Sequence, residues 1–528
     1  MTKYLLRRLL HGLFSIIVVV SIVMILIYSL MDRTLIFAQD VNYTKYANND
    51  KQVYRYERWE DYGYLDYVTY TDYINELARN GEFGDNDAAR QKVLNFGKKV
   101  ENDSEEVAVY VKKFTDYYKE KGYEVIRLDA KMLTEAKYAT GGKQRLFAVR
   151  DIPLTTRLWK FFTGLFWVDN IHNAEGIADE DRGLTFTFND PIREGKFSPT
   201  IMGNGTTYKY LLYTDDRFPY IHQNLFTLKL GLSYSVNQNV DVWKTMTQIQ
   251  GALVKSEVVY PTGYVVSESA EDLHTARYQY GSRDLLPLYQ LKFEDDYTVL
   301  DFHLSGMSRM GYSFVIGILS TIFAYLLGLP LGIIMARNKD GIIDKIGTVY
   351  VIFIIAVPSL AYIFMFKAIG DKLFHLPTTF DTEKTNLAMY VLPIVSLALP
   401  SVAGLMKWLR RYMIDQMNSD YVKFARSGGL SEGEIFTKHI FKNAAIPIVH
   451  GIPGSILFSL VGALVTERVY VVPGVGNTLT KAINYYDNGV IVGITLFYSV
   501  LSVVSIILGD ILMSMVDPRI SFSSKGRS

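Results

Sequence analysis

The 528-residue sequence contains no cysteine. This absence excludes a disulfide-stabilised scaffold, a thiolate zinc site and a cysteine nucleophile. Net charge is also nearly absent, with 55 Lys and Arg against 54 Asp and Glu and a formal charge of +1. Because one packed core rarely serves more than roughly 300 residues, the chain is too long for a single simple globular domain.

Motifs for nucleotide and metal binding are missing as well. Gly141-Gly142-Lys143 lacks the spacing and the Ser/Thr of a P-loop. The eight histidines are scattered, and none belongs to a metal-binding pattern. Asp179-Glu180-Asp181 lacks the spacing and glycine of a calcium loop and is interpreted as a solvated turn. We therefore expect no bound metal, no ATPase activity and no catalytic residues in this chain.

The charges that are present are unevenly distributed. Residues 32–308 hold 33 basic and 41 acidic residues, so the rest of the chain is net basic. The near-neutral total is therefore a cancellation between an acidic middle and a basic frame.

Six long stretches are apolar and free of Lys, Arg, Asp and Glu: 9–31, 313–336, 346–366, 387–406, 446–466 and 490–509. About 20 helical residues, at about 1.5 Å each, cross a hydrocarbon core of about 30 Å. The sequence therefore predicts six membrane spans. The first could instead be a signal peptide, but its apolar run is longer than a typical h-region and no small-residue cleavage site follows it, which favours a retained anchor.

Basic residues near the spans predict the orientation. Segments 1–8, 337–345, 407–445 and 510–528 together hold sixteen Lys and Arg, whereas the short loops on the other side hold only a few. The positive-inside rule then places both termini in the cytoplasm and residues 32–308 outside the cell.

The 32–308 segment is predicted to be folded and of mixed α+β structure. A helix is expected from Asp103 to about Gly122, and Leu184, Phe186 and Phe188 alternate with polar residues as in a half-buried strand.

One further helical face in this segment is strongly apolar. It consists of Leu158, Phe161, Phe162, Leu165 and Phe166. Two interpretations stay open, a core face of the domain or a helix that lies on the outer leaflet.

The 407–445 loop between the fourth and fifth spans carries the clearest local signals. A helix is expected from 408 to 426, ending at Gly428-Gly429. Ser431 and Glu434 then fit a capping box, with Leu430 and Ile435 as its hydrophobic staple. A second helix is expected to run to about residue 443, before Pro447 at the start of the fifth span. Such a fixed protrusion suggests a docking element; the alternative is a simple connector.

This loop resembles the EAA loop of ABC importer membrane subunits in the oligopeptide/dipeptide permease branch. The resemblance rests on residues 421–432, YVKFARSGGLSE, and 438–447, KHIFKNAAIP. Residues 467–476, ERVYVVPGVG, the terminal 517–520, DPRI, with Asp510, and the opening 4–9, YLLRRL, also agree with the family. Lys423-Phe424 departs from the generic Glu-Ala. The long 32–308 insert is similar to the enlarged form in streptococcal-type peptide permeases.

The resemblance implies an α-helical polytopic membrane protein with six transmembrane helices in the type I ABC importer fold and an α+β insert. Its divisions would be residues 1–31, the extracellular domain 32–308, and the permease core 309–528 with the coupling loop 407–445. It also implies import of oligopeptides across a bacterial plasma membrane, in a Gram-positive cell. The implied partners are a second homologous permease subunit, two cytoplasmic ATPases that bind ATP and Mg, an extracellular peptide-binding lipoprotein and membrane lipid, but no nucleic acid.

Candidate functional residues fall into two groups. The resemblance assigns coupling to the ATPases to Ala425, Arg426, Gly429, Leu430, Ser431, Glu432, Glu434 and Pro447. Polar or helix-breaking residues in and after the fifth span are candidates for the translocation path or its gate: His450, Pro453, Glu467, Pro473 and Gly474.

Other functions remain as alternatives. A permease of the same family could carry a dipeptide or nickel, although nickel would require intramembrane ligands at metal spacing, and His450 stands alone. A membrane-anchored extracellular binding protein, enzyme or adhesin would have no use for an EAA-like loop.

Overall fold

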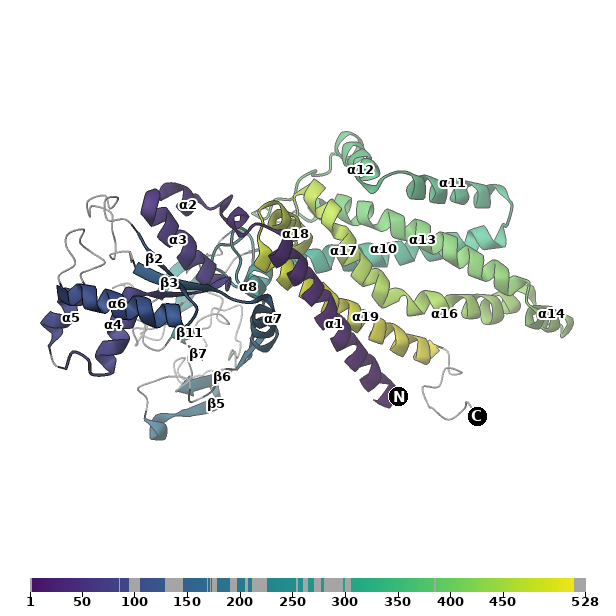
Figure 1. Ribbon diagram of the computed structural model, residues 1–528. Coiled ribbons are helices and arrows are strands. Elements are labelled where there is room, and N and C mark those ends of the chain that lie inside the picture. The colour runs from purple at the N-terminus through teal and green to yellow at the C-terminus, as the bar shows by residue number, and fades with distance from the viewer. Residues whose placement is uncertain are drawn as a thin grey trace.

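The chain is described here by a computed structural model, in which a bundle of long helices adjoins a mixed α+β part (Figure 1). We call the second part the insert; it comprises residues 32–308. The structure describes residues 2–84, 86–94, 105–128, 146–168, 170, 172, 178–189, 197–204, 208–210, 226–252, 255–259, 265–269, 277–279, 298–299, 305–383 and 386–516. The predicted start of a helix at Asp103 and the 517–520 motif lie outside these residues.

Among the described residues, five helices are long and apolar enough to cross a membrane, which makes this a multi-pass membrane protein. They are α1 (Thr2–Leu30), α10 (Arg309–Arg337), α13 (Val391–Met417), α17 (Ile452–Tyr470) and α19 (Asn488–Val516). Within the bundle, α10 packs closely on α13, where a Cβ on Gly328 would lie 2.8 Å from the Cβ of Leu405. Glycine therefore permits the close approach of these two helices.

The third apolar run is not one straight span, contrary to expectation. It forms α11 (Ile342–Ala356) and α12 (Ser359–Phe374), which are bent by 113° relative to each other, so the count reaches six only if the pair is one span. The break falls at Val357-Pro358, where Val357 is extended. A residue before proline disfavours helical geometry, and proline supplies no N–H to continue the helix.

The helices of the 407–445 loop also differ from prediction. The first is interrupted at Asn418-Ser419, which separates α13 from α14 (Asp420–Ser427). The second does not end near residue 443. It continues from α15 (Glu432–Glu434) through a π-helical turn, η7 (Ile435–Phe441), and α16 (Lys442–His450) up to a bend at Gly451. Pro447 does not stop α16, and the chain bends only where Gly451 precedes Pro453, near the start of α17.

The last short helix of the bundle is α18 (Val475–Asn484), between α17 and α19. Before α13 comes the 3₁₀ turn η6 (Leu387–Tyr390).

The insert contains helices and small antiparallel sheets, as expected. Its N-terminal half holds η1 (Arg33–Phe37), α2 (Val41–Lys45), α3 (Asn48–Asp61), β1 (Leu65–Thr69), α4 (Tyr70–Arg79), α5 (Asp87–Leu94), α6 (Glu105–Glu120), β2 (Glu124–Arg127), β3 (Leu146–Asp151) and α7 (Leu154–Thr163). Strands β1, β3 and β2 form one antiparallel sheet, with β3 in the centre. Buried Phe147 of β3 and Phe114 of α6 belong to the cores on its two sides.

The second half of the insert is mostly short strands. These are β4 (Phe166–Val168), β5 (Gly183–Asn189), β6 (Phe197–Asn204), β7 (Tyr208–Tyr210), β8 (Phe226–Leu228), β9 (Lys255–Val259), β10 (Val265–Ser269), β11 (Arg277–Gln279) and β12 (Thr298–Val299), with the turn η4 (Asp179–Asp181) and helix α8 (Val242–Thr247). The pairs β5–β6, β4–β8 and β9–β10 are antiparallel.

Three sequence predictions for the insert can be compared with these elements. The helix expected to end near Gly122 is α6, and the solvated turn is η4, whose residues are exposed. The strand expected from Leu184, Phe186 and Phe188 is β5, but its burial was wrongly predicted, since these three side chains are about half exposed. Among the described residues, β5 pairs with β6 alone, in a two-stranded sheet.

Candidate functional site

The turn between α14 and α15 is fixed by a Schellman motif. Gly429 has a φ of +82°, a conformation that costs glycine little. Its N–H donates to the carbonyl of Arg426 at 3.1 Å, and the N–H of Leu430 donates to the carbonyl of Ala425 at 3.3 Å. These are the two hydrogen bonds that end a helix in this motif. Four of the predicted coupling residues therefore define the shape of one turn.

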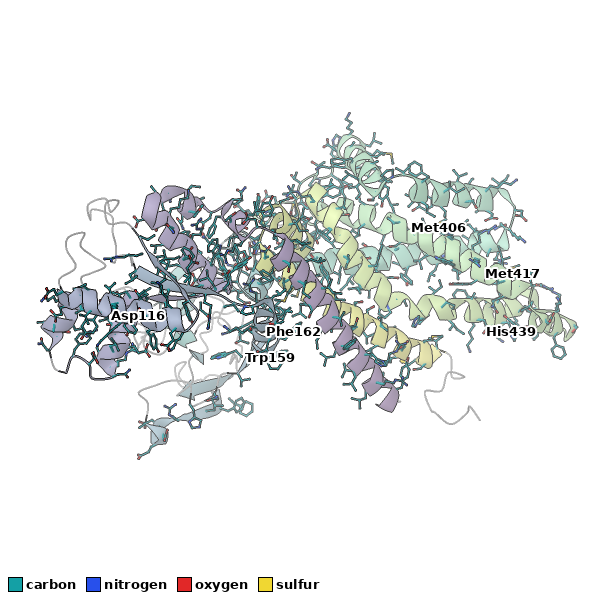
Figure 2. All side chains as sticks on the ribbon, in the orientation of Figure 1. Asp116, Trp159, Phe162, Met406, Met417 and His439 are labelled. Atoms are coloured by element: carbon teal, nitrogen blue, oxygen red, sulfur yellow. The ribbon has the colours of Figure 1, made fainter. Side chains whose placement is uncertain are left out.

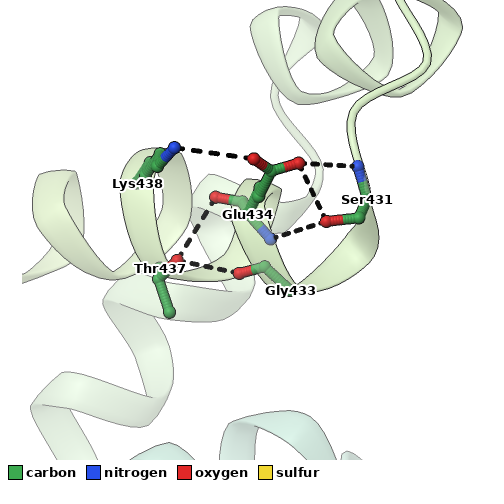
Figure 3. A network of polar contacts seen from close by, with 5 residues as sticks. All are labelled: Ser431, Gly433, Glu434, Thr437 and Lys438. Atoms are coloured by element: carbon green, nitrogen blue, oxygen red, sulfur yellow. Dashed lines mark hydrogen bonds and ion pairs between the residues drawn. The ribbon is translucent and has the colours of Figure 1, made fainter.

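The capping box predicted for the next helix is confirmed (Figure 3). The Ser431 hydroxyl accepts from the Glu434 N–H at 3.3 Å, while the Glu434 carboxylate accepts from the Ser431 N–H at 3.3 Å and from its hydroxyl at 2.9 Å. Lys438 lies 3.5 Å from the same carboxylate. Hydrogen bonds from Ser431 and the charge of Lys438 lower the pKa of Glu434. The first turn of the helix is thus satisfied locally and needs no partner to form.

An ion pair joins the two sides of this turn. Arg426 Nε lies 2.5 Å from Glu432 Oε1, and Arg426 Nη2 lies 3.1 Å from Glu432 Oε2. The hydrogen bonds from Arg426 lower the pKa of Glu432, although both side chains are solvent-exposed. This two-point contact bridges α14 and α15 across the Gly428-Gly429 turn.

The loop has a buried side and an exposed side. Buried residues pack it against α10 and α13, and they include Val422, Ala425, Ile435, Ile440 and Ala444. On the open side, Phe424 is 79% exposed and Leu430 is 40% exposed. The exposure of Phe424 was not predicted, although its departure from the generic alanine was a visible signal. The loop therefore presents a rigid frame with an exposed apolar tip.

The candidate gate residues of the 467–474 region meet in one buried cluster. The Glu467 side chain is fully buried, and its Oε1 accepts from Ser313 Oγ at 2.6 Å. Its Oε2 accepts from the N–H of Asn477 at 2.9 Å, in the first turn of α18. A Cβ on Gly474 would lie 2.3 Å from the Glu467 carboxyl carbon. Glu467 thus caps the N-terminus of α18, where helix amides favour a negative charge; Pro473 and Gly474 form the turn that brings α18 back to it.

His450 and Pro453 lie away from this cluster. They flank the bend between α16 and α17, with His450 exposed and Pro453 buried. The intervening 19-residue α17 spans about 28 Å, so the five candidate path residues form two separate groups rather than one site. Within the described part of the chain, no three or more His, Asp or Glu side chains are grouped as metal ligands.

A groove next to the bend was not predicted from the sequence. It has a volume of about 450 Å³ and lies between α10, α13 and the α16–α17 bend. Its polar lining includes the Tyr325 hydroxyl, which lies 3.1 Å from Ser455 Oγ. The sequence feature that could have predicted this groove is the high density of proline and glycine in the helices that form its two walls. The lining residues are Tyr325, Pro400, Ser401, Gly404, Leu405, Trp408, Tyr412, Pro447, Ile448, Gly451, Gly454, Ser455 and Phe458.

Two further contacts join distant parts of the chain. Buried Asp487, between α18 and α19, accepts hydrogen bonds from Ser233 Oγ at 2.7 Å and from the N–H of Tyr234 at 2.9 Å. The insert is therefore fastened to the bundle. At the other end of α19, Asp510 accepts from the Tyr4 hydroxyl at 2.9 Å and lies 3.1 Å from Arg8 Nε. The residues that resemble the family's opening and closing motifs are thus in contact.

Known proteins resemble this chain over its core and over its whole length. The family described as "Binding-protein-dependent transport system inner membrane component" matches residues 328–522. The oligopeptide transport system permease protein AmiC of Streptococcus pneumoniae is 34% identical over 532 residues, covering 100% of both chains. The dipeptide transport system permease protein DppB of Bacillus subtilis is 31% identical over 42% of this chain and 72% of its own.

A crystal structure of an amino acid ABC transporter covers 40% of this chain and 92% of its own at 16% identity; its TM-score of 0.30 is too low to carry a conclusion. The full-length identity of 34% is decisive. The chain belongs to the oligopeptide permease family of ABC importer membrane subunits.

Proposed function

We propose that this chain imports oligopeptides as one of two permease subunits of an ATP-driven transporter. The support is its similarity to an oligopeptide permease over 100% of both chains, the insert included. The same relative comes from Streptococcus pneumoniae, which supports a Gram-positive plasma membrane. The basic segments flanking the spans support cytoplasmic termini and an extracellular insert.

The observation that carries this proposal is the doubly capped 407–445 loop. Its Schellman turn and capping box form without a partner, and its apolar tip, Phe424, is exposed. A rigid tip with a large exposed aromatic suits insertion into a partner's cleft. The partners are two cytoplasmic ATPases, which bind ATP and Mg.

A mechanical route leads from this tip to the groove. Helix α15 continues through η7 and α16 to Gly451, and Pro447, Ile448 and Gly451 form one wall of the groove. A push on α15 by a closing ATPase therefore moves that wall directly. With a second permease subunit opposite, this movement opens and closes a path to alternate sides of the membrane.

The insert receives peptide from an extracellular binding lipoprotein. Asp487 fastens the insert beside α18 and α19, near the Glu467 cluster at the start of α18. The proposed orientation makes this end of the bundle the extracellular one. Delivery therefore occurs at the end of the bundle opposite the ATPases.

Reconstitution tests the proposal. The chain is co-expressed with the proposed second permease subunit and ATPases, purified, and placed in liposomes with the binding lipoprotein. We expect ATP hydrolysis to rise several-fold with an oligopeptide and labelled peptide to accumulate. Stimulation by a dipeptide or Ni²⁺ alone would indicate the alternative cargo, and failure of any ATPase to co-purify would indicate a membrane-anchored binding protein.

A further inference from the structure

Helix α7 of the insert is pinned to the end of α1. The Arg157 guanidinium lies 4.6 Å from the ring centre of Tyr28, in the last turn of α1, and 4.5 Å from that of Tyr64. Its Nη2 also donates to the Tyr64 carbonyl at 2.9 Å. Because α1 is a membrane-spanning helix, this clamp holds α7 at the level where α1 leaves the membrane.

The apolar face of α7 is occupied by protein. Leu158, Phe161 and Phe162 pack against the cluster formed by α1, α18 and α19. The core interpretation therefore holds for these residues and for Leu165, all of which are partly buried. Phe166, the fifth residue of the predicted face, lies in β4 and is 69% exposed, so for this residue the lipid interpretation stays a prediction.

The flank of α7 next to this face exposes a large aromatic residue. Trp159 is 72% exposed, beside exposed Lys160 and between Thr155 and Thr163, which lie one turn away on either side. Figure 2 labels Trp159 and Phe162 on α7, beside α1. Helix α7 contains two basic residues and no acidic residue. A tryptophan among threonine and lysine is typical of the membrane–water boundary.

The following strand extends the exposed surface. In β4, Phe166 is 69% exposed and Val168 is 47% exposed, whereas Trp167 points to the other face, where Lys229 lies 5.2 Å from its ring centre. Alternation along the strand thus places two apolar side chains together.

The neighbouring surface of α1 indicates what covers this region. Helix α1 is largely exposed along its length, with Ile22, Leu26 and Leu30 open near its end, as expected for a lipid-facing span. Helix α7 contacts α1 directly, so the lipid-facing surface of α1 continues onto α7.

We infer that Trp159, together with Phe166 and Val168, contacts the headgroup and upper acyl region of the membrane. The insert therefore rests on lipid as well as on the helical bundle. Assignment to the outer leaflet rests on the orientation proposed above; contact with lipid does not.

Single-cysteine labelling tests this inference, because the natural chain has no cysteine. Trp159→Cys is labelled with a nitroxide in the assembled transporter in lipid nanodiscs. The matched controls are Leu26→Cys on α1, which is 52% exposed, and Val109→Cys on α6, which is 53% exposed at the far end of the insert (Figure 1). Accessibility to oxygen and to a water-soluble nickel chelate is then measured at each position.

We expect the oxygen-to-nickel ratio at position 159 to resemble that at position 26 rather than that at position 109. A ratio like that at position 109 would show a water-exposed surface and overturn the inference. Low access to both reagents would also overturn it, since a protein partner would then cover Trp159. Accessibility of Val109→Cys to an impermeant thiol reagent on intact cells reports orientation separately, so an inverted topology is distinguished from a missing lipid contact.

Discussion

Ser233 donates its hydroxyl hydrogen to Asp487, 254 positions later in the chain, over 2.7 Å. The same carboxylate oxygen accepts the backbone N–H groups of Tyr234, Ser235 and Val236 at 2.9–3.0 Å. One buried carboxylate therefore accepts hydrogen bonds from four groups of the insert that would otherwise donate to water. Besides the chain connections to α1 and α10, this contact holds the insert against the α18–α19 end of the bundle.

Removing this carboxylate is expected to loosen the insert. Asp487→Ala leaves two buried and two partly buried donors without their acceptor and costs roughly 3 kcal/mol. Ser233→Ala removes one donor and costs about 1 kcal/mol. The measurement is the thermal unfolding midpoint in detergent, with limited proteolysis of the insert. Asp420→Asn, at an exposed site, is the control; equal midpoints for all three variants would contradict the role of Asp487.

Position 429 distinguishes a shaped docking loop from a connector. Gly429→Ala places a Cβ at positive φ, which costs roughly 1–2 kcal/mol and distorts the Schellman turn. We expect ATP hydrolysis to continue while peptide uptake falls at least several-fold. Gly433→Ala is the matched control, because nothing lies within 4 Å of its Cβ and its φ is ordinary. Normal uptake by Gly429→Ala, and by the bulkier Gly429→Arg, would exclude the docking role.

Substitution of Phe424 tests the tip of the loop. Its side chain is 79% exposed, so Phe424→Ala should leave the stability of the isolated subunit within about 0.5 kcal/mol. We expect weaker retention of the ATPases during co-purification. Tyr421→Ala, whose hydroxyl is hydrogen-bonded to Gln416, is the control on the same helix. Unchanged retention in Phe424→Ala would place the contact elsewhere on the loop.

The capping box predicts a pH dependence of the loop. Hydrogen bonds to Glu434 lower its pKa below the ordinary 4.5, so the ionised side chain stabilises the helix at neutral pH. This stabilisation is present above the ordinary pKa and is lost as the pH falls through the lowered one. Amide protection at Glu434, measured by hydrogen exchange, should therefore hold from pH 7 to about 4.5 and fall below it. Ser431→Ala should lack this protection at every pH; equal protection in both proteins would count against the cap.

Glu467→Gln separates a structural cap from a gate. Glutamine keeps only one acceptor oxygen, so either the Ser313 hydroxyl or the N–H of Asn477 loses its acceptor, and we expect a loss of roughly 1–3 kcal/mol and a lower unfolding midpoint. A gate without a structural role would instead change transport at unchanged stability. Thermal unfolding and uptake are measured on the same preparation.

The sequence predicted those elements that depend on residues close together in the chain. The Ser431–Glu434 cap follows from a spacing of three residues, and the spans follow from apolar runs about 20 residues long. The bend at Val357-Pro358 could also have been predicted from the proline. The hydropathy of the third apolar run, however, indicates only the length of the run and not the direction of its helices. The depth of Glu467 and the partner of Asp487 depend on residues more than 150 positions away, which no local pattern encodes.

The contact of Tyr4 with Asp510 has a consequence for biosynthesis. The two residues are 506 positions apart, so α1 enters the membrane long before its partner exists. At about 5–20 residues per second, ribosomes need roughly 25–100 s to synthesise the intervening chain. During that time, Tyr4 and Arg8 of α1 lack the hydrogen bond and the ion pair to Asp510. Formation of this contact therefore requires synthesis to reach the last two turns of α19.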